Sequence, residues 1–388
     1  MVSIETTDKA LKSFYLDAIT KEIDDKGSVF LSMIEKTSAN VTGKDVKKVI
    51  KTGLHTGVGA GSETGDLPYG DSVSPIVLTA PLKNIYGVIE ISDKAIRASG
   101  SNEGAFVNLL NDEMDTLIKS AKYQLGRMLF GDSTGKLATI VGVSDNYINI
   151  KDAVALQAGM YVDLWSAADK LIKNNCCIKS INNNKTQIQV SAPGEEFLTD
   201  VEPGWSFRVC GVEDNSELTG LAAIFSDNDI YGVDRSKQYM RPFVSENVGE
   251  IDEETLQTCM DKIEEAGGSP VNVMICSWGV RRALIRAFKE RNYPITTIKF
   301  GENASALSFN GVPIVVDRFC PQGTLYMLNT NDFKLCQLGD WEWMQGEDSK
   351  ILKQVAGRPI YTATLVKYAE LLCLKPCGQG VLRDIEEA

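Results

Sequence analysis

The sequence predicts an α+β protein that is completed by contacts with other chains, and three features carry this prediction. Residues 51–75 form a long polar, glycine-rich stretch with almost nothing to bury. A strand-like run, IYGVIEIS, follows at 85–92, and the apolar spacing after it predicts an unusually long amphipathic helix over 101–130. A tongue that cannot pack on its own chain needs a partner, and a neighbouring copy is the obvious one. We therefore expect a protein whose work is assembly.

The N-terminal part predicts an arm followed by a long hairpin. Apolar residues recur at helical spacing near the start of the chain, and a second apolar patch lies at 29–34. We interpret residues 1–45 as an arm that lies across something else. Val46 opens the outgoing strand of the hairpin, and Ile76 opens its return. The glycine-rich tip cannot be regular structure. The alternative is a disordered loop between two strands.

The middle of the chain predicts a strut and an insertion. About 28 residues of helix over 101–130, with Ser101 as a plausible N-cap, would form a rod of roughly 40 Å. Short strand signals then recur over 136–212, divided by asparagine-rich turns such as INNNKT. Regular short strands with turn punctuation indicate a small β-barrel or sandwich.

The C-terminal part returns to an α/β pattern. Helices are predicted at 253–268 and 277–292, with Ser277 capping the second. Strands are predicted at 271–277, 312–316, 324–329 and 332–338. The apolar segment 362–376 is expected to close a sheet begun much earlier. The acidic tail, DIEEA, is expected to be loose.

Composition excludes several function classes. The net charge is −12, so sequence-specific nucleic-acid binding is not expected, although lying next to nucleic acid without gripping it remains possible. There is no run of 18 apolar residues and no secretory signal, which predicts no membrane partner and synthesis in a cytoplasm. The nine cysteines show no pairing pattern, and Cys373/Cys377 is at best half of a metal site. His55, the one histidine, lies in the tongue. No catalytic, cofactor-binding or metal-binding residue is therefore predicted.

Eight stretches, taken in order, resemble the major capsid proteins of tailed bacteriophages, which have the Hong Kong 97-type fold. They are IYGVIEISDKAIRAS (85–99), GAFVNLLNDEMDTLIKSAKYQLGRMLFGD (104–132), ELTGLAAIF (217–225), YGVDRS (231–236), ICSWGVRRAL (275–284), FNGVPIVVDR (309–318), LYMLNTNDFKLCQLGDWEWM (325–344) and TATLVKYAELLC (362–373). No single stretch is a chemical signature, so specificity comes from the order of all eight.

The resemblance implies the named parts of that fold. The peripheral domain would combine the spine helix with strands from 85–95, from near 310–330 and from 362–376. The implied divisions are an N-terminal arm (1–45), an E-loop hairpin (46–90), the peripheral domain with the spine helix (91–135), a β-barrel-like insertion domain (136–212), an axial domain (213–308) and return strands of the axial and peripheral domains with the C-terminus (309–388).

The resemblance also implies a function and partners. The chain would be a structural protein, without enzymatic activity, that assembles with itself as hexamers and pentamers of an icosahedral shell. The shell would enclose double-stranded DNA without sequence-specific binding. Assembly would occur in the host bacterial cytoplasm, and the product would be the virion. No scaffolding region is evident at the start of the chain, so a separate scaffolding protein is expected, with a portal and a decoration protein as further partners.

Nine residues are candidates for contacts between subunits. Acidic tongue residues would pair with arginines of the next copy, and two tryptophans would be either interface anchors or core residues. The alternative for every charged candidate is a solvated side chain. The candidates are Glu63, Asp66, Tyr69, Asp71, Arg281, Arg282, Arg286, Trp341 and Trp343, with Arg291 as a further basic partner.

Three rival functions remain open at this point. The first is an encapsulin-like cellular nanocompartment, which has the same fold and holds an enzyme. The second is an enzyme with Cys276 as a nucleophile activated by a helix N-terminus. The third is an extracellular adhesin, which the missing signal peptide and the unpaired cysteines oppose.

Overall fold

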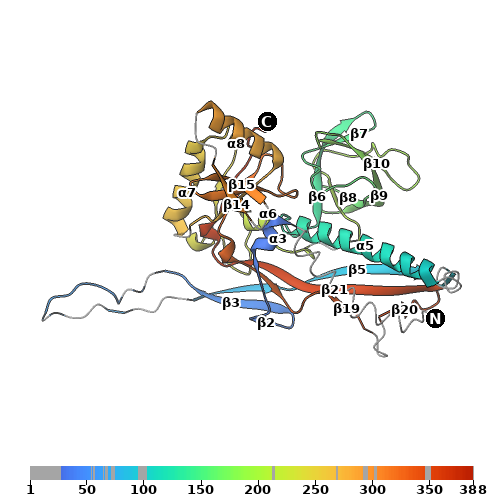
Figure 1. The fold of residues 1–388 in the computed structure, drawn as a ribbon, viewed down its shortest axis with the longest axis horizontal. Helices are drawn as coiled ribbons and strands as arrows, with labels where there is room; N and C mark the ends of the chain where they lie inside the picture. Colours follow the sequence, from blue (N-terminus) through green and yellow to red (C-terminus); the bar gives the residue numbers. More distant parts are fainter. Residues whose placement is uncertain are drawn as a thin grey trace.

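The computed structural model describes residues 28–53, 55, 57–63, 65, 69–70, 75–94, 103–211, 215–267, 270–291, 296–300, 304–345 and 351–387. They form a long sheet with a helix along it, a second α/β body, a separate barrel and a projecting hairpin (Figure 1).

The long sheet is organised around β21 (Ile360–Cys373). β5 (Lys83–Ser92) runs antiparallel to it from Ala369↔Lys83 to Ile360↔Ser92. The expectation that the segment 362–376 closes a sheet begun much earlier is confirmed. The other strands of this six-stranded sheet are β1 (Glu35–Thr37), β18 (Phe333–Gln337), β19 (Glu342–Trp343) and β20 (Lys353–Gln354).

The predicted long helix is α5 (Glu103–Met128), which has 26 residues and a length of about 39 Å. It runs along the β5–β21 pair (Figure 1). A Cβ atom on Gly87 of β5 would lie 2.8 Å from Leu117 of α5, so the absent side chain allows the helix to approach the strand. Ser101, the expected N-cap, lies outside the described residues. The face of α5 toward the core includes Met114, Ile118 and Leu125.

A seven-stranded sheet, in the order β12-β22-β17-β13-β16-β15-β14, forms the second body with helices α7 (Glu253–Gly267) and α8 (Trp278–Glu290). Ser277 caps α8, as predicted, by accepting a hydrogen bond from Val280 N at 3.3 Å. The strands are β12 (Phe243–Ser245), β13 (Val273–Cys276), β14 (Thr296–Phe300), β15 (Ala304–Phe309), β16 (Val312–Val316), β17 (Leu325–Leu328) and β22 (Gly380–Leu382).

The assignment of residues near 310–330 to the peripheral sheet is wrong. β16 and β17 flank β13 on its two sides, in parallel and antiparallel pairing respectively. Every residue of β13 and β17 is buried, as expected of strands covered on both faces. These apolar runs therefore form the centre of the second body, and Tyr326 of β17 also packs in the main apolar cluster that contains the core face of α5.

Residues 136–209 form a closed barrel in the order β10-β7-β6-β11-β8-β9, with an apolar core of its own. The chain enters and leaves the barrel at neighbouring points, because Val209 N donates to Gly135 O and Glu217 N donates to Ser133 O, each at 3.2 Å. The strands are β6 (Lys136–Ser144), β7 (Tyr147–Ile150), β8 (Tyr161–Trp165), β9 (Leu171–Ile181), β10 (Gln187–Ser191) and β11 (Ser206–Val209).

The described part of the N-terminal arm packs on its own protomer, which corrects the expectation that it lies elsewhere. Phe30 and Leu31 of α3 (Val29–Met33) are fully buried in the main core. The carboxylate of Asp317 accepts hydrogen bonds from the Ser28 hydroxyl and from Val29 N, the latter at 2.9 Å. β1 then pairs in parallel with β18. Residues 1–27 lie outside the described residues.

The acidic tail is also ordered, contrary to expectation. Ile385 is buried and bridges to Gly249, and the Glu387 carboxylate accepts from Gly323 N at 2.7 Å and from the Ser277 hydroxyl. Local composition predicts a loose tail, but these partners are distant in sequence. The remaining short helices are α6 (Leu221–Ile224), η2 (Gln238–Met240), η3 (Thr330–Asp332) and η4 (Pro376–Gly378).

Candidate assembly surfaces

The tongue begins as a regular hairpin with a buried base. β3 (Asp45–Lys51) pairs with β4 (Pro75–Pro81) along its whole length, and β2 (Val41–Thr42) adds a short third strand. Thr79 N donates to Tyr231 O at 2.9 Å. The base is fixed by three buried side chains that belong to the main core, Val46, Leu78 and Ala80.

Beyond this base the hairpin projects away from the protomer (Figure 1) and carries exposed apolar side chains. Val49 and Val77 are directly opposite each other in the register and are 57% and 46% exposed. In the tip, Val58 is 86% exposed and Tyr69 is 87% exposed. Apolar side chains on a projecting element are surface that a partner is able to cover.

His55 organises the base of the tip. Its Nδ1 accepts a hydrogen bond from Gly57 N at 3.0 Å. A Cβ atom on Gly57 would lie 2.7 Å from the imidazole, and one on Gly70 would lie 3.2 Å from it. The two glycines therefore allow the outgoing and returning chains to close on one ring, which is a structural use of the histidine.

A second apolar surface lies on β5, on the face turned away from α5. Ile85, Ile89 and Ile91 are buried, whereas the alternate residues are exposed, because successive side chains of a strand point to opposite faces. Tyr86 is 54% and Val88 is 52% exposed. The alternation in IYGVIEIS was a signal for this surface that our sequence reading used only to predict a strand.

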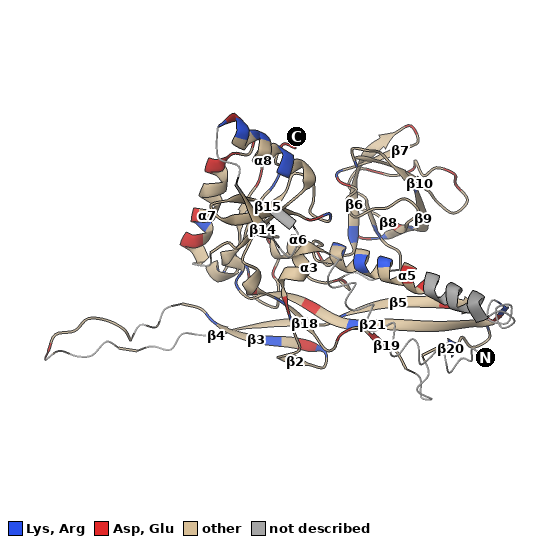
Figure 2. Ribbon diagram, viewed as in Figure 1, with Lys and Arg blue, Asp and Glu red and all other residues tan. Residues whose placement is uncertain are grey.

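Among the described residues, the predicted charged contacts are not brought together within one protomer. Glu63 is exposed in the tip, and Asp66 and Asp71 lie outside the described residues. The arginines at 281, 282 and 286 are exposed on α8, in the second body and away from the hairpin (Figure 2). A contact between Glu63 and these arginines therefore requires another copy.

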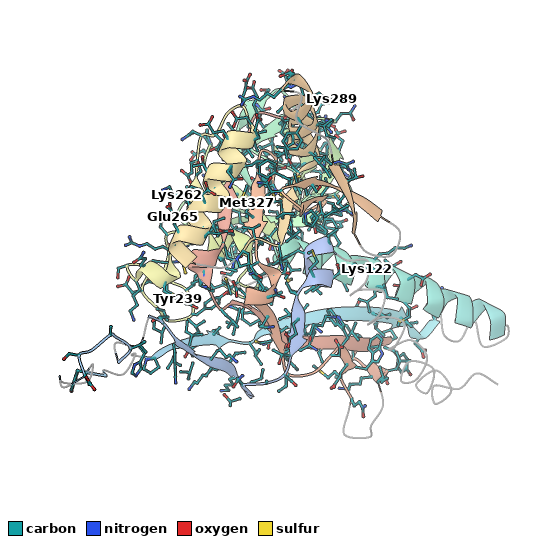
Figure 3. The ribbon with its side chains drawn as sticks, turned by 60° about the vertical axis from the view of Figure 1, so that its left-hand side comes forward. Lys122, Tyr239, Lys262, Glu265, Lys289 and Met327 are labelled. Atoms are coloured by element: carbon teal, nitrogen blue, oxygen red, sulfur yellow. The ribbon has the colours of Figure 1, made fainter. Side chains whose placement is uncertain are left out.

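The basic surface of α8 has an acidic counterpart that sequence reading missed. α7 exposes Glu254, Asp261 and Glu264, and Figure 2 shows acidic residues on α7 and basic residues on α8. Glu265 of α7 is 3.0 Å from Lys262 (Figure 3).

Arg291 is held within its own protomer. Its guanidinium lies 2.8 Å from Asp252 and 3.3 Å from Glu253, at the start of α7. Arg291 therefore links the end of α8 to the start of α7.

The two candidate anchor tryptophans are core residues of the protomer. Trp341 is 2% and Trp343 is 5% exposed, and both belong to the main apolar cluster. The Lys367 ammonium lies 5.6 Å from the Trp341 ring centroid and 2.8 Å from Asp340 Oδ1. Of the two alternatives expected for this pair, the structure therefore matches core packing.

The chemical alternatives find little support. Cys276 is fully buried, and burial raises the pKa of its thiol to about 12, so it is protonated at neutral pH. Among the described residues no group of three metal-ligating side chains gathers, and no helix is long and apolar enough to cross a membrane.

One buried carboxyl group was not singled out from the sequence. The Glu370 side chain of β21 is completely buried and accepts hydrogen bonds from Thr219 N at 2.8 Å and Leu371 N at 2.9 Å. Its Oε2 atom has no hydrogen-bond partner in the part of the chain that the structure describes. Burial raises the pKa of this carboxyl group to about 7.

Comparisons with known proteins find capsid proteins that resemble this chain in fold or in sequence. The capsid protein in the asymmetric unit of the cyanophage A-1(L) capsid has a similar fold, with a TM-score of 0.53 at 12% identity, over 92% of each chain. The family model for the SU10 major capsid protein matches residues 178–350, which include part of the barrel and most of the second body. The chain thus has the fold of a phage capsid protein, and its residues 178–350 match the SU10 major capsid protein family.

Two further solved structures resemble the chain, with lower TM-scores. The encapsulin of Synechococcus elongatus has a TM-score of 0.48 at 10% identity, over 92% of this chain and 86% of that chain. The satellite phage P4 procapsid, which includes a size determination protein, has a TM-score of 0.47 at 10% identity, over 96% and 99%. No curated protein matches the sequence.

The shared fold is the Hong Kong 97-type fold that the sequence resemblance implied. The β3–β4 hairpin lies within the residues expected to form the E-loop, and α5 lies within those expected to form the spine helix. The barrel lies within the residues expected to form the insertion, and α7 and α8 lie within the segment expected to form the axial domain.

Proposed function

We propose that copies join when the projecting part of the β3–β4 hairpin covers the exposed face of β5 in a neighbouring protomer. The observation that carries this proposal is the exposed Val49–Val77 pair immediately beyond a buried base. Tyr86 and Val88 offer an apolar surface of matching character on another element. Burial of both surfaces removes apolar area from water, which stabilises the contact by about 25 cal/mol for each Å² buried.

Substitution of single residues by aspartate tests this contact. Val77→Asp and Tyr86→Asp each place a charge where apolar burial is expected, so each should abolish closed shells while leaving the protomer folded. Val141→Asp is the matched control, because Val141 is 59% exposed on the barrel. Negative-stain electron microscopy and sedimentation velocity measure assembly, and circular dichroism measures folding. Normal shells from both contact variants would contradict the proposal.

We propose further that the arginines of α8 bind carboxylates of a neighbouring copy, and that α7 supplies them. Around a symmetric ring the same two surfaces meet at every junction, so one acidic and one basic helix suffice. Arg286→Glu should prevent assembly, and Glu254→Lys in the same chain should restore it. Rescue by Glu63→Lys instead would assign the partner to the hairpin tip. Lys179→Glu on the barrel controls for net charge.

The proposal extends to what the shell encloses and to the proteins that take part in its assembly. We infer that hexamers and pentamers enclose double-stranded DNA without sequence-specific contacts, and that the chain contributes no catalysis. A separate scaffolding protein would guide assembly, with a portal and a decoration protein completing the particle. Mass spectrometry and nuclease protection of particles from infected cells test this. Particles that protect an enzyme cargo and no nucleic acid would favour the encapsulin-like alternative.

A further inference from the structure

A cleft between the spine helix and the barrel has an unusual lining. It has a volume of about 540 Å³ and lies between α5, the barrel loop at 157–160 and the segment 318–319. Lys119 and Lys122 (Figure 3) come from α5, and Arg318 comes from the connection after β16. Among the described residues, neither an aspartate nor a glutamate lines the cleft, although the chain carries a net charge of −12.

Arg318 is held by aromatic rings at the wall of the cleft. Its guanidinium carbon lies 5.3 Å from the ring centroid of Tyr123 and 5.2 Å from that of Phe319. The two rings meet edge to face at 5.2 Å. Stacking of this kind leaves the edge of the guanidinium available for hydrogen bonds and limits the conformations it must give up on binding.

Tyr123 adds a hydrogen-bond donor without a partner. Its hydroxyl is buried and has no hydrogen-bond partner among the described residues. Burial raises the pKa of this hydroxyl to about 12, so it keeps its proton at neutral pH. A buried donor without an acceptor costs free energy, and an oxygen-rich anion would remove that cost.

We propose that this cleft binds phosphate groups of the nucleic-acid backbone, and that the barrel insertion serves to complete it. The inference rests on the proposed function, because a shell that encloses DNA faces a high concentration of backbone phosphates. The three cations supply attraction without sequence preference, since phosphate contacts carry no base information. The loop at 157–160 supplies the wall opposite α5, so a chain without the barrel would present these cations on an open surface.

The test measures binding of a fluorescent 20-base-pair duplex to the purified full-length protein at several salt concentrations. Each phosphate contact contributes a slope of about −0.9 to the logarithm of affinity against the logarithm of salt concentration. Lys119→Gln and Arg318→Gln should each lower the slope by about one and weaken binding at low salt. Lys179→Gln, outside the cleft, should leave the slope unchanged. Arg318→Lys keeps the charge without the planar stack, and its slope should stay near that of the wild type.

Competitors separate the possible ligands. Tripolyphosphate should displace the duplex, whereas polyglutamate of equal charge should not. Equal slopes for the cleft variants and the Lys179 control would overturn the proposal, as would stronger displacement by polyglutamate, which would assign the cleft to an acidic protein segment. Binding of tripolyphosphate without binding of duplex would also overturn it in favour of a free anion. Shell formation is scored separately by electron microscopy, so loss of DNA binding in variants that still assemble separates this inference from the assembly proposal.

Discussion

The buried carboxyl group of Glu370 predicts that the protomer loses stability as pH rises toward neutrality. The folded state raises the pKa of this group from 4.5 to about 7, because burial disfavours the charged form. Between these values the folded protein holds a proton that the unfolded chain has released. Stability therefore falls as pH rises through this interval, and the contribution is fully present only below pH 4.5. At 1.36 kcal/mol per pKa unit the loss is about 3 kcal/mol.

Glu370→Gln isolates this effect. Glutamine resembles the protonated acid, retains an acceptor for Thr219 N and Leu371 N, and does not titrate. The free energy of unfolding is measured by urea denaturation of unassembled protein at pH 4.5 and pH 8, followed by tryptophan fluorescence. Between pH 4.5 and pH 8, the free energy of unfolding of the variant should rise by about 3 kcal/mol relative to that of the wild type.

A matched substitution on the open face of the same sheet serves as the control. Glu90 lies on β5 and is exposed, so Glu90→Gln removes a solvated carboxyl group and controls for the loss of one negative charge. Other titrating groups cancel in the comparison with wild type. If the Glu370→Gln difference were flat from pH 4.5 to pH 8, the reasoning from burial to titration would be refuted.

Three further predictions concern packing and chemistry. Asp317→Ala should destabilise the protomer by about 1–3 kcal/mol and speed tryptic cleavage of the arm, because buried donors lose their acceptor; an unchanged cleavage rate would count against this anchor. Arg127→Met should cost about 3–5 kcal/mol in denaturation, since it leaves the carboxylate of Glu217 buried and unpaired, and adding Glu217→Leu should recover much of the loss. Cys276 should resist iodoacetamide in the native protein at pH 8, as read by mass spectrometry, and rapid labelling would reopen the nucleophile hypothesis.

The elements that sequence reading predicted well carry a strong periodic signal. α5, α7 and α8 keep apolar residues at helical spacing, and Ser277 has the side chain that an N-cap requires. The alternation over 85–92 and the apolar runs of β13 and β16 likewise identify strands from local pattern alone. A barrel over residues 136–209 follows the regular recurrence of short strands and turns.

The elements that it missed depend on partners distant in the chain. β14 and β15 pair with each other in antiparallel fashion, and their polar and small residues weaken any apolar pattern. β1 has three residues and becomes a strand only through β18. The C-terminal tail is ordered through bonds to Ser277 and Gly323. Sequence position likewise could not decide whether Trp341 lies in a core or at an interface.

The adjacent entry and exit of the barrel has a practical consequence for engineering. The backbone bonds at Gly135 and Ser133 close the neck of this loop independently of what it encloses. A short turn or a foreign domain with closely spaced ends could therefore replace residues 136–208 at little cost in loop-closure entropy, because Val209 and its bond to Gly135 are kept. The engineered protomer would then display an antigen or an enzyme at a fixed, repeated position on an assembled particle.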